Sequence, residues 1–222
     1  VYGYRFERSR TFDPDPAVSD PFPLDFIANL ARMSGAVLFD RRDDPLNARR
    51  GTFSSISWDH SALWLGSDVS NQKLLMQQYL FIPLGPRLVF ASRIQSGFVF
   101  GLDGLLASDR FVAGGTTTVR GYRQDSLGPR DSFGVPNGGE TLVVLNQEIR
   151  FPIYRWIQGV GFIDAGNITR RGDSAWKELK VGYGLGLRFD TPAGLMRIDF
   201  GMPRSRTGST TGRWYFGFGH IF

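Results

Sequence analysis

The chain has 222 residues and a mass of 24.8 kDa, which suits one domain or one medium-sized barrel and is too little for several enzyme modules. It has no cysteine and two histidines, which argues against disulfide scaffolds, Cys/His zinc sites and Ser-His-Asp triads. On composition, an active site would have to be built from carboxylates alone. We expect no cofactor, no metal and no catalytic residue. The net charge of +5 comes from basic residues scattered among acidic ones, a pattern that does not favour nucleic-acid binding.

The hydropathy pattern does not predict membrane-spanning helices. Such a helix needs roughly 18 consecutive apolar residues, and no run of the sequence approaches that length. A membrane β-barrel needs only about 10 residues per strand, with alternate positions apolar. The 28 glycines and the aromatic content of 14% are typical of that class. The first residues already resemble a strand, with no signal peptide before them, so we expect the chain to begin inside a longer precursor.

Between frequent Gly and Pro residues, the sequence alternates with period two, which predicts strands. The clearest case is about 179–191, where Leu185 and Leu187 share one face while Gly186 and Arg188 share the other. The pattern predicts an all-β protein with about ten strands. In chain order they are expected at about 2–10, 30–39, 51–65, 72–84, 87–100, 141–151, 156–166, 179–191, 195–202 and 212–222.

Alternation alone does not separate a membrane barrel from a soluble sandwich, but three features favour the barrel. One face of the strands carries charges of both signs and many glycines, as a polar lumen would. Tight connections near 83–87, 151–154 and 190–194 alternate with long ones, as in outer-membrane barrels. The long connections are expected at about 11–30, 101–138, 167–177 and 203–211. Aromatic residues near strand ends suit interfacial girdles: Trp58, Trp64, Tyr79, Tyr154, Trp156, Trp214 and Phe222.

The longest connection, about 101–138, contains Gly114-Gly115-Thr116-Thr117-Thr118-Val119-Arg120-Gly121-Tyr122. A loop of more than about 15 residues is usually functional or disordered, and this one has apolar residues with which it can fold. Its segment Val119, Arg120, Gly121 and Tyr122 resembles the VRGY/VRGF motif of the BamA/TamA superfamily. The resemblance implies that the loop folds back into the lumen of a barrel.

Two further segments carry the resemblance. Phe162-Ile163-Asp164-Ala165-Gly166 is similar to an FxDxG pattern that the family places on a later strand. The segment 146–152 resembles the family strand whose glutamate, here Glu148, points inward. The similarity is clear over about 40–222 and implies that Phe162, Asp164, Gly166 and Glu148 lie beside the loop motif.

The chemistry of arginine supports this placement. An arginine inside a barrel needs counter-charges, and a guanidinium matches carboxylates in bidentate geometry. Asp164 and Glu148 are therefore the expected partners of Arg120, while Gly121 allows a tight bend and Tyr122 provides an apolar anchor with a polar tip. Spacing alone would also allow the alternative that Arg120 lies on a solvated loop and Asp164 ends an ordinary strand.

The last expected strand carries a second signal. Aromatic residues alternate along 214–222, and Gly217, Phe218 and Phe222 resemble the β-signal by which outer-membrane proteins are recognised for insertion. His220 departs from that pattern, because its position is usually apolar. The alternative is the aromatic edge strand of a soluble sheet, which would invite aggregation unless it were covered.

These observations predict that residues 1–222 form a transmembrane antiparallel β-barrel domain in the outer membrane of a bacterium or an organelle. The resemblance implies that its roughly ten strands correspond to the last ten of a sixteen-stranded barrel, and that it is not an enzyme. The favoured interpretation is a fragment of a longer barrel, and the alternative is a reduced barrel closed between the strand at 1–11 and the final strand. The implied function is the folding and membrane insertion of β-barrel or autotransporter clients, through lateral opening beside the last strand and strand templating.

The expected partners are membrane lipid or lipopolysaccharide, unfolded outer-membrane protein clients, and periplasmic POTRA modules or partner subunits encoded upstream. Nucleic acid is not expected as a partner. Two other functions stay open. One is protein translocation through a two-partner-secretion type of export pore in the same superfamily, and the other is binding by a soluble all-β protein.

Overall fold

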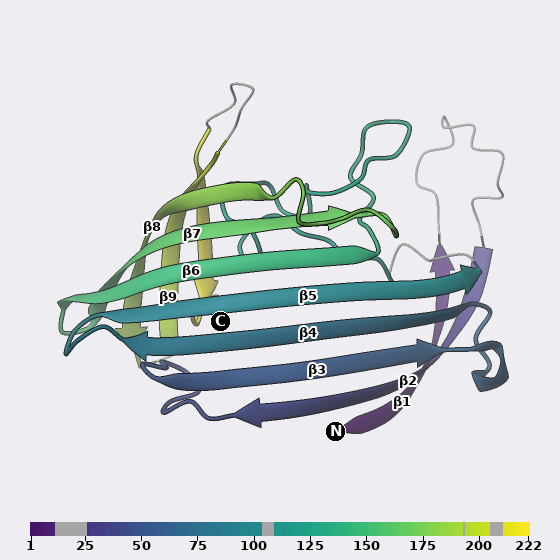
Figure 1. Ribbon diagram of the computed structural model, residues 1–222, viewed down its shortest axis with the longest axis horizontal. Coiled ribbons are helices and arrows are strands. Elements are labelled where there is room, and N and C mark those ends of the chain that lie inside the picture. The colour runs from purple at the N-terminus through teal and green to yellow at the C-terminus, as the bar shows by residue number, and fades with distance from the viewer. Residues whose placement is uncertain (12–25, 104–108, 193, 205–210) are drawn as a thin grey trace.

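The fold is one antiparallel sheet of ten strands in which each strand pairs with its neighbours in sequence order. The computed structural model describes residues 1–11, 26–103, 109–192, 194–204 and 211–222. The sheet curls on itself, so that β9 and β10 lie behind β5 and β6 (Figure 1). The expected all-β fold with ten strands is confirmed. These strands are β1 (Tyr2–Thr11), β2 (Phe26–Asp40), β3 (Gly51–Ser61), β4 (Ser70–Pro83), β5 (Val89–Asp103), β6 (Thr141–Tyr154), β7 (Ile157–Thr169), β8 (Lys180–Thr191), β9 (Gly194–Pro203) and β10 (Arg213–Phe218).

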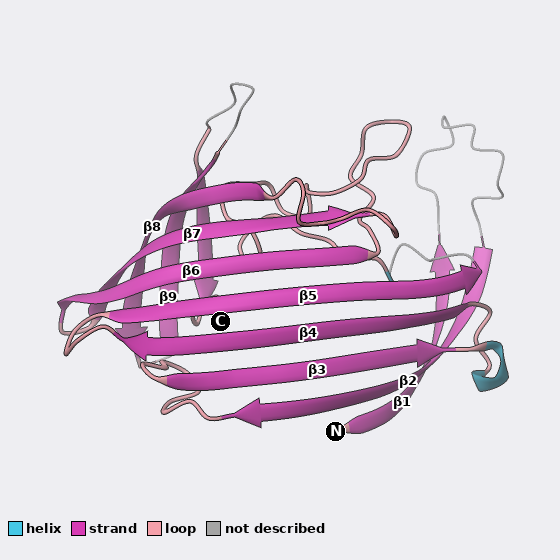
Figure 2. Ribbon diagram, in the orientation of Figure 1, coloured by secondary structure: helices cyan, strands magenta, loops and turns pink. Residues whose placement is uncertain are grey.

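The edges of the sheet are β1 and β10. Within the described residues, β1 pairs only with β2 and β10 pairs only with β9, so the sheet is curved but not closed. Strands dominate the structure, and a 3-10 helix, η1 (Leu63–Leu65), lies between β3 and β4 (Figure 2). No helix of the described residues has the length and apolar character needed to cross a membrane.

The two faces of the sheet have opposite chemistry. On the convex face, large apolar side chains are exposed, such as Leu185 at 69% and Phe218 at 74%. On the concave face, charged side chains such as Arg188 and Asp199 are fully buried. A water-soluble protein buries apolar residues and exposes charged ones, whereas a membrane barrel presents an apolar surface to lipid and encloses polar groups. The observed faces therefore match a membrane barrel, which the polar face, the alternating connections and the aromatic residues near strand ends favour in the sequence.

The concave face also contains a small apolar core that holds the long loop between β5 and β6. Phe111 and Val119 of the loop pack against Val99, Leu142 and Ile168 of the sheet. Gly97 makes this contact possible, because a Cβ atom there would lie within 2.5 Å of the Phe111 ring. The loop thus folds into the curve of the sheet, as expected for the part of 101–138 that the structure describes. Residues 104–108 and most of the expected connections 11–30 and 203–211 lie outside the described residues.

Two strands end earlier than the sequence predicts. The expected strand 51–65 stops at Ser61, because η1 follows and Gly66 adopts a positive φ of 92°. The expected strand 212–222 stops at Phe218, because Gly219 adopts a φ of 73° and turns the chain inward. Both turns require the left-handed backbone region that glycine enters without strain.

The inward turn at Gly219 corrects the expected position of Phe222. The alternation places Phe222 on the same face as Phe218, at a membrane interface, and this prediction is wrong. The last residue instead lies behind β4 and β5 (Figure 1), where its ring packs against Phe81 and Ala91. The expected interfacial position of Tyr79 is also wrong, because its ring faces the same cluster and lies 5.7 Å from the Phe222 ring.

Candidate functional site

The centre of the concave face is occupied by Arg120, whose side chain has no exposed surface. Its guanidinium binds Asp164 of β7 in bidentate fashion, with Nε to Oδ2 at 2.7 Å and Nη2 to Oδ1 at 2.9 Å. The Arg120 backbone N–H donates to the same carboxylate at 3.0 Å. Its Nη1 donates to Glu148 of β6 at 2.9 Å and to Asp199 of β9 at 3.2 Å. The structure therefore brings Arg120 together with both expected partners, and with a third.

The carboxylates of this cluster bind two further arginines. Arg188 of β8 donates to Asp199 at 2.5 Å, and Arg150 of β6 donates to Glu148 at 2.9 Å. With Arg120 and Asp164, the cluster contains three arginines and three carboxylates, all at least 97% buried. Removing one partner of such a buried pair leaves an uncompensated charge, at a cost of about 3–5 kcal/mol. The cluster thus spans four consecutive strands, β6 to β9, and Arg120 of the loop motif binds three of them directly, β6, β7 and β9.

Phe162 and Gly166, the other two residues of the predicted pattern on β7, also contact the motif. The Arg120 guanidinium lies over the Phe162 ring, 3.5 Å from its centroid, in cation–π geometry. Gly166 leaves space for Val119, because a Cβ atom at position 166 would lie 2.8 Å from Val119 Cγ2. The spacing of Phe162, Asp164 and Gly166 places all three on the concave face, since side chains alternate along a strand.

Gly121 and Tyr122 complete the motif. Gly121 has a φ of 99°, and a Cβ atom there would lie 2.7 Å from the Met202 backbone of β9. The position thus needs glycine both for its backbone conformation and for the close approach to the strand. The Tyr122 ring packs against the apolar core, and its hydroxyl donates to the Val181 carbonyl at 3.3 Å. Burial raises the pKa of Tyr122.

Several residues at the site were not predicted from the sequence. Asn146 donates to the Thr118 carbonyl at 2.6 Å and to Asp164 at 2.8 Å. Tyr215 of β10 hydrogen-bonds to the backbone of Gly121 and Tyr122. A usable signal was present for Tyr215, because alternation places it opposite the outward aromatic residues of its strand. Asp199 and Arg188 likewise share the predicted polar face of their strands.

A second anchor holds the start of the loop to the opposite wall of the sheet. Asp109 is 1% exposed, forms an ion pair with Arg32 of β2, and accepts a hydrogen bond from Asn71 of β4 at 2.6 Å. Nearby, the Lys73 ammonium lies over the Phe111 ring, 4.5 Å from its centroid. The loop is therefore fixed at Asp109 to β2 and β4 and at Arg120 to β6, β7 and β9.

Sequence comparison agrees with this architecture. A model of the Omp85 superfamily domain matches residues 2–222, which is nearly the whole chain. The chain belongs to the Omp85 superfamily. The expected resemblance to the BamA/TamA type of outer-membrane barrel is thereby confirmed.

Curated relatives of this Omp85 chain come from bacteria and from organelles. It is 26% identical to the outer membrane protein assembly factor BamA of Nitratidesulfovibrio vulgaris over 237 aligned positions, covering 100% of this chain and 29% of that protein. It is 34% identical to the chloroplastic outer envelope protein 80 of Arabidopsis thaliana over 148 residues, covering 62% of this chain and 18% of that protein. It is 33% identical to the sorting and assembly machinery component 50 homolog of Mus musculus over 110 residues, covering 49% of this chain and 23% of that protein. The chain thus spans less than a third of each relative.

A solved structure supports the fold directly. The crystal structure of BamA from Haemophilus ducreyi lacking POTRA domains 1–3 matches with a TM-score of 0.76 and 17% identity, covering 92% of this chain and 44% of that chain. The ten strands of the Omp85 chain therefore correspond to part of the BamA barrel. Together with the superfamily match, this agrees with the expected outer-membrane location.

The three residues of the predicted β-signal lie in different environments. Phe218 points outward, whereas Gly217 faces the concave side, where a Cβ atom would lie 2.9 Å from Arg197 Nε. Phe222 is buried against β4 and β5, and Arg150 donates to its carbonyl at 3.2 Å. The role of these residues as a recognition signal stays a prediction.

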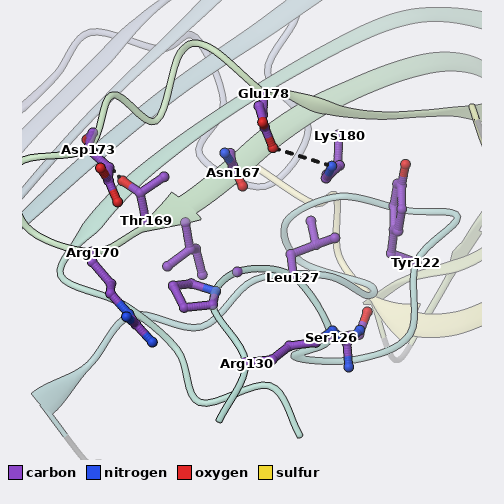
Figure 3. Close-up of a pocket in the computed structure, with 13 residues that line it drawn as sticks. Tyr122, Ser126, Leu127, Arg130, Asn167, Thr169, Arg170, Asp173, Glu178 and Lys180 are labelled. Carbon is purple, nitrogen blue, oxygen red and sulfur yellow. Dashed lines mark hydrogen bonds and ion pairs between the residues drawn. The ribbon is translucent and has the colours of Figure 1, made fainter. Parts of the chain in front are cut away.

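A cleft of about 720 Å³ lies beside the loop (Figure 3). Tyr122 and Arg130 line it from the loop, and Asp173, Glu178 and Lys180 line it from the β7–β8 connection and the start of β8. Lys180 Nζ lies 4.0 Å from Glu178 Oε2, and the Lys180 side chain is about half exposed while that of Glu178 is largely exposed. The lining carries both signs of charge, so it favours neither anions nor cations. Across the described ranges, no group of three or more His, Cys, Asp or Glu side chains could hold a metal ion.

Proposed function

We propose that this chain is the barrel portion of an outer-membrane assembly factor that inserts β-barrel clients and is not an enzyme. The observation that carries the proposal is the buried Arg120 cluster, which fixes the loop inside a sheet whose edge strands have one described partner each. Relatives named as an assembly factor and as a sorting and assembly component support the same function. The energy for insertion would come from the folding of the client itself.

The last strand is suited to accept a client strand. β10 has six residues and pairs only with β9, from Arg213 opposite Gly201 to Phe218 opposite Met196. Its other edge carries backbone N–H and C=O groups that can pair with an incoming strand by β-augmentation. Its outward residues, including Phe216 and Phe218, are aromatic and exposed, which suits contact with lipid during this exchange.

The charge cluster would support this exchange by keeping the loop in place. Arg120 binds β6, β7 and β9, so it braces the wall beside β10 without contacting a reacting group. Its role would be structural rather than catalytic. POTRA modules or partner subunits would act from parts of the protein beyond this chain, and lipid or lipopolysaccharide would contact the convex face.

Reconstitution of the full-length protein into lipid vesicles tests the proposal. Urea-denatured barrel clients are added, and their insertion is followed by their heat-modifiable gel migration. Arg120→Ala should slow insertion at least tenfold and weaken the barrel's own heat-resistant migration, because it leaves the buried Asp164 carboxylate without its arginine partner. Arg123→Ala, which changes an exposed arginine of the same loop, is the matched control and should behave as wild type.

Two results would contradict the proposal. Arg120→Ala with unchanged insertion and unchanged migration would show that the cluster does not support assembly. Wild-type protein that leaves clients outside the bilayer, but carries an unfolded secreted substrate into the vesicle lumen, would instead indicate an export pore.

A further inference from the structure

The Tyr215 hydroxyl connects the last strand to the loop motif. It accepts a hydrogen bond from the Gly121 N–H at 2.8 Å and donates one to the Tyr122 carbonyl at 2.7 Å. Tyr215 is 8% exposed, so water does not readily replace either bond. One side-chain oxygen therefore uses both its donor and its acceptor capacity on two consecutive backbone groups of the motif.

The alternation of β10 explains why this tyrosine reaches the loop. Trp214 and Phe216 point outward and are more than 60% exposed, whereas Tyr215 points to the concave side. On the neighbouring strand β9, Gly201 leaves the space through which the loop backbone approaches, because a Cβ atom there would lie 2.8 Å from the Gly121 nitrogen. Without that glycine, the motif could not come within hydrogen-bonding distance of β10.

The Tyr215 contact differs from those of Arg120. Arg120 binds Asp164, Glu148 and Asp199, which lie on β7, β6 and β9 and not on β10. Among the described residues, Tyr215 is the side chain of β10 that hydrogen-bonds to the loop. Within the described residues β10 pairs with β9 alone, so the Tyr215 contact attaches the edge strand to the loop in addition to its ladder with β9.

We propose that Tyr215 is a positioning residue that couples the β10 edge to the loop motif. Through its two hydrogen bonds, β10 can move freely only when the loop motif shifts, and the loop motif can move freely only when β10 shifts. The inference rests on the proposed function, in which the β10 edge receives a client strand. Coupling of this kind is reciprocal, because each element stabilises the same arrangement of the other.

Amide hydrogen exchange of the full-length protein in lipid nanodiscs tests the coupling without any client. Tyr215→Phe removes the hydroxyl and keeps the ring, so the packing should survive. It leaves the Gly121 N–H without its partner, and exchange should become roughly tenfold faster both at 121–122 and along 213–218. Exchange in β3 to β5 should stay at the wild-type rate. Tyr183→Phe, the same chemical change on the convex face of β8, is the control and should leave β10 unchanged.

A reciprocal variant guards against misfolding of Tyr215→Phe. Arg120→Lys keeps Tyr215 intact but loses the bidentate contact with Asp164, and it should speed exchange along β10 as well as in the loop. Unchanged β10 exchange in either variant, while the loop exchanges faster, would overturn the coupling. Client insertion by the wild-type protein, measured separately in vesicles, decides the proposed function independently of these exchange rates.

Discussion

Asp109, at the start of the long loop, forms an ion pair with Arg32 of β2, although the two residues are 77 positions apart in the sequence. Asn71 of β4 donates to the other oxygen of the same carboxylate. This contact lies on the opposite wall from the Arg120 cluster, so the loop connects two distant parts of the curved sheet.

Replacing Asp109 should therefore loosen the sheet as well as the loop. Asp109→Ala removes the partner of both Arg32 and Asn71 and should lower the free energy of unfolding by about 1–3 kcal/mol, because buried polar groups lose their hydrogen bonds. The urea midpoint of the folded barrel in detergent measures this change. Asp125→Asn, which alters an exposed carboxylate of the same loop, should leave the midpoint within error. Equal midpoints for Asp109→Ala and wild type would show that the anchor contributes nothing.

Gly166→Ala should displace the loop motif. The added Cβ atom would lie 2.8 Å from Val119 Cγ2 and 2.9 Å from the Val143 carbonyl, so we expect a loss of about 1–3 kcal/mol from overpacking. Gly161→Ala is the matched control on the same strand, because its Cβ atom would lie 3.8 Å from Leu185 Cδ2, an ordinary contact. Protease cleavage of the loop checks the outcome. Cleavage should be faster for Gly166→Ala than for Gly161→Ala, and equal cleavage would refute the role assigned to Gly166.

Phe222→Ala should destabilise the barrel, whereas Phe218→Ala should not. The Phe222 ring is 9% exposed and packs against Phe81 and Ala91, so its loss should cost about 3 kcal/mol. Phe218 is 74% exposed on the convex face, where lipid can fill the space left by its ring. Urea midpoints of pre-folded proteins isolate this packing effect from any recognition during insertion. A larger decrease of the urea midpoint for Phe218→Ala than for Phe222→Ala would contradict the conclusion that the Phe222 ring is packed and the Phe218 ring is exposed.

The strands could be predicted because the sheet has one apolar and one polar face, so that apolar and polar residues alternate along each strand. Along β8, Leu185 and Leu187 face outward while Arg188 is buried, as the alternation predicts. The strand ends were less predictable. Gly66 and Gly219 turn the chain through positive φ, but the sequence contains many other glycines that stay within strands. Contacts with residues distant in the sequence decide which glycine adopts a positive φ and ends a strand.

The site residues that belong to a family motif could be predicted from the sequence. Glu148 and Asp164 follow from the resemblance, and the structure places both against Arg120. Asp199 also contacts Arg120, from 79 positions away in the sequence. Alternation puts Asp199 on the correct face, but its depth on that face depends on the register and curvature of the sheet. Sequence patterns within one strand do not specify either quantity.

The opposite chemistry of the two faces sets a strict rule for changes in strand length. A single residue inserted in β6 between Leu145 and Asn146 would reverse every side chain on one side of the insertion, because the strand period is two. If the part toward the β6–β7 turn reversed, Glu148 and Arg150 would face lipid and Ile149 would face the charge cluster. Two inserted residues would restore the original direction. Because Arg120 needs Glu148, 28 positions later in the sequence, on the concave face, insertions and deletions of an even number of residues in β6 keep the contact. Changes by an odd number would turn Glu148 away from Arg120.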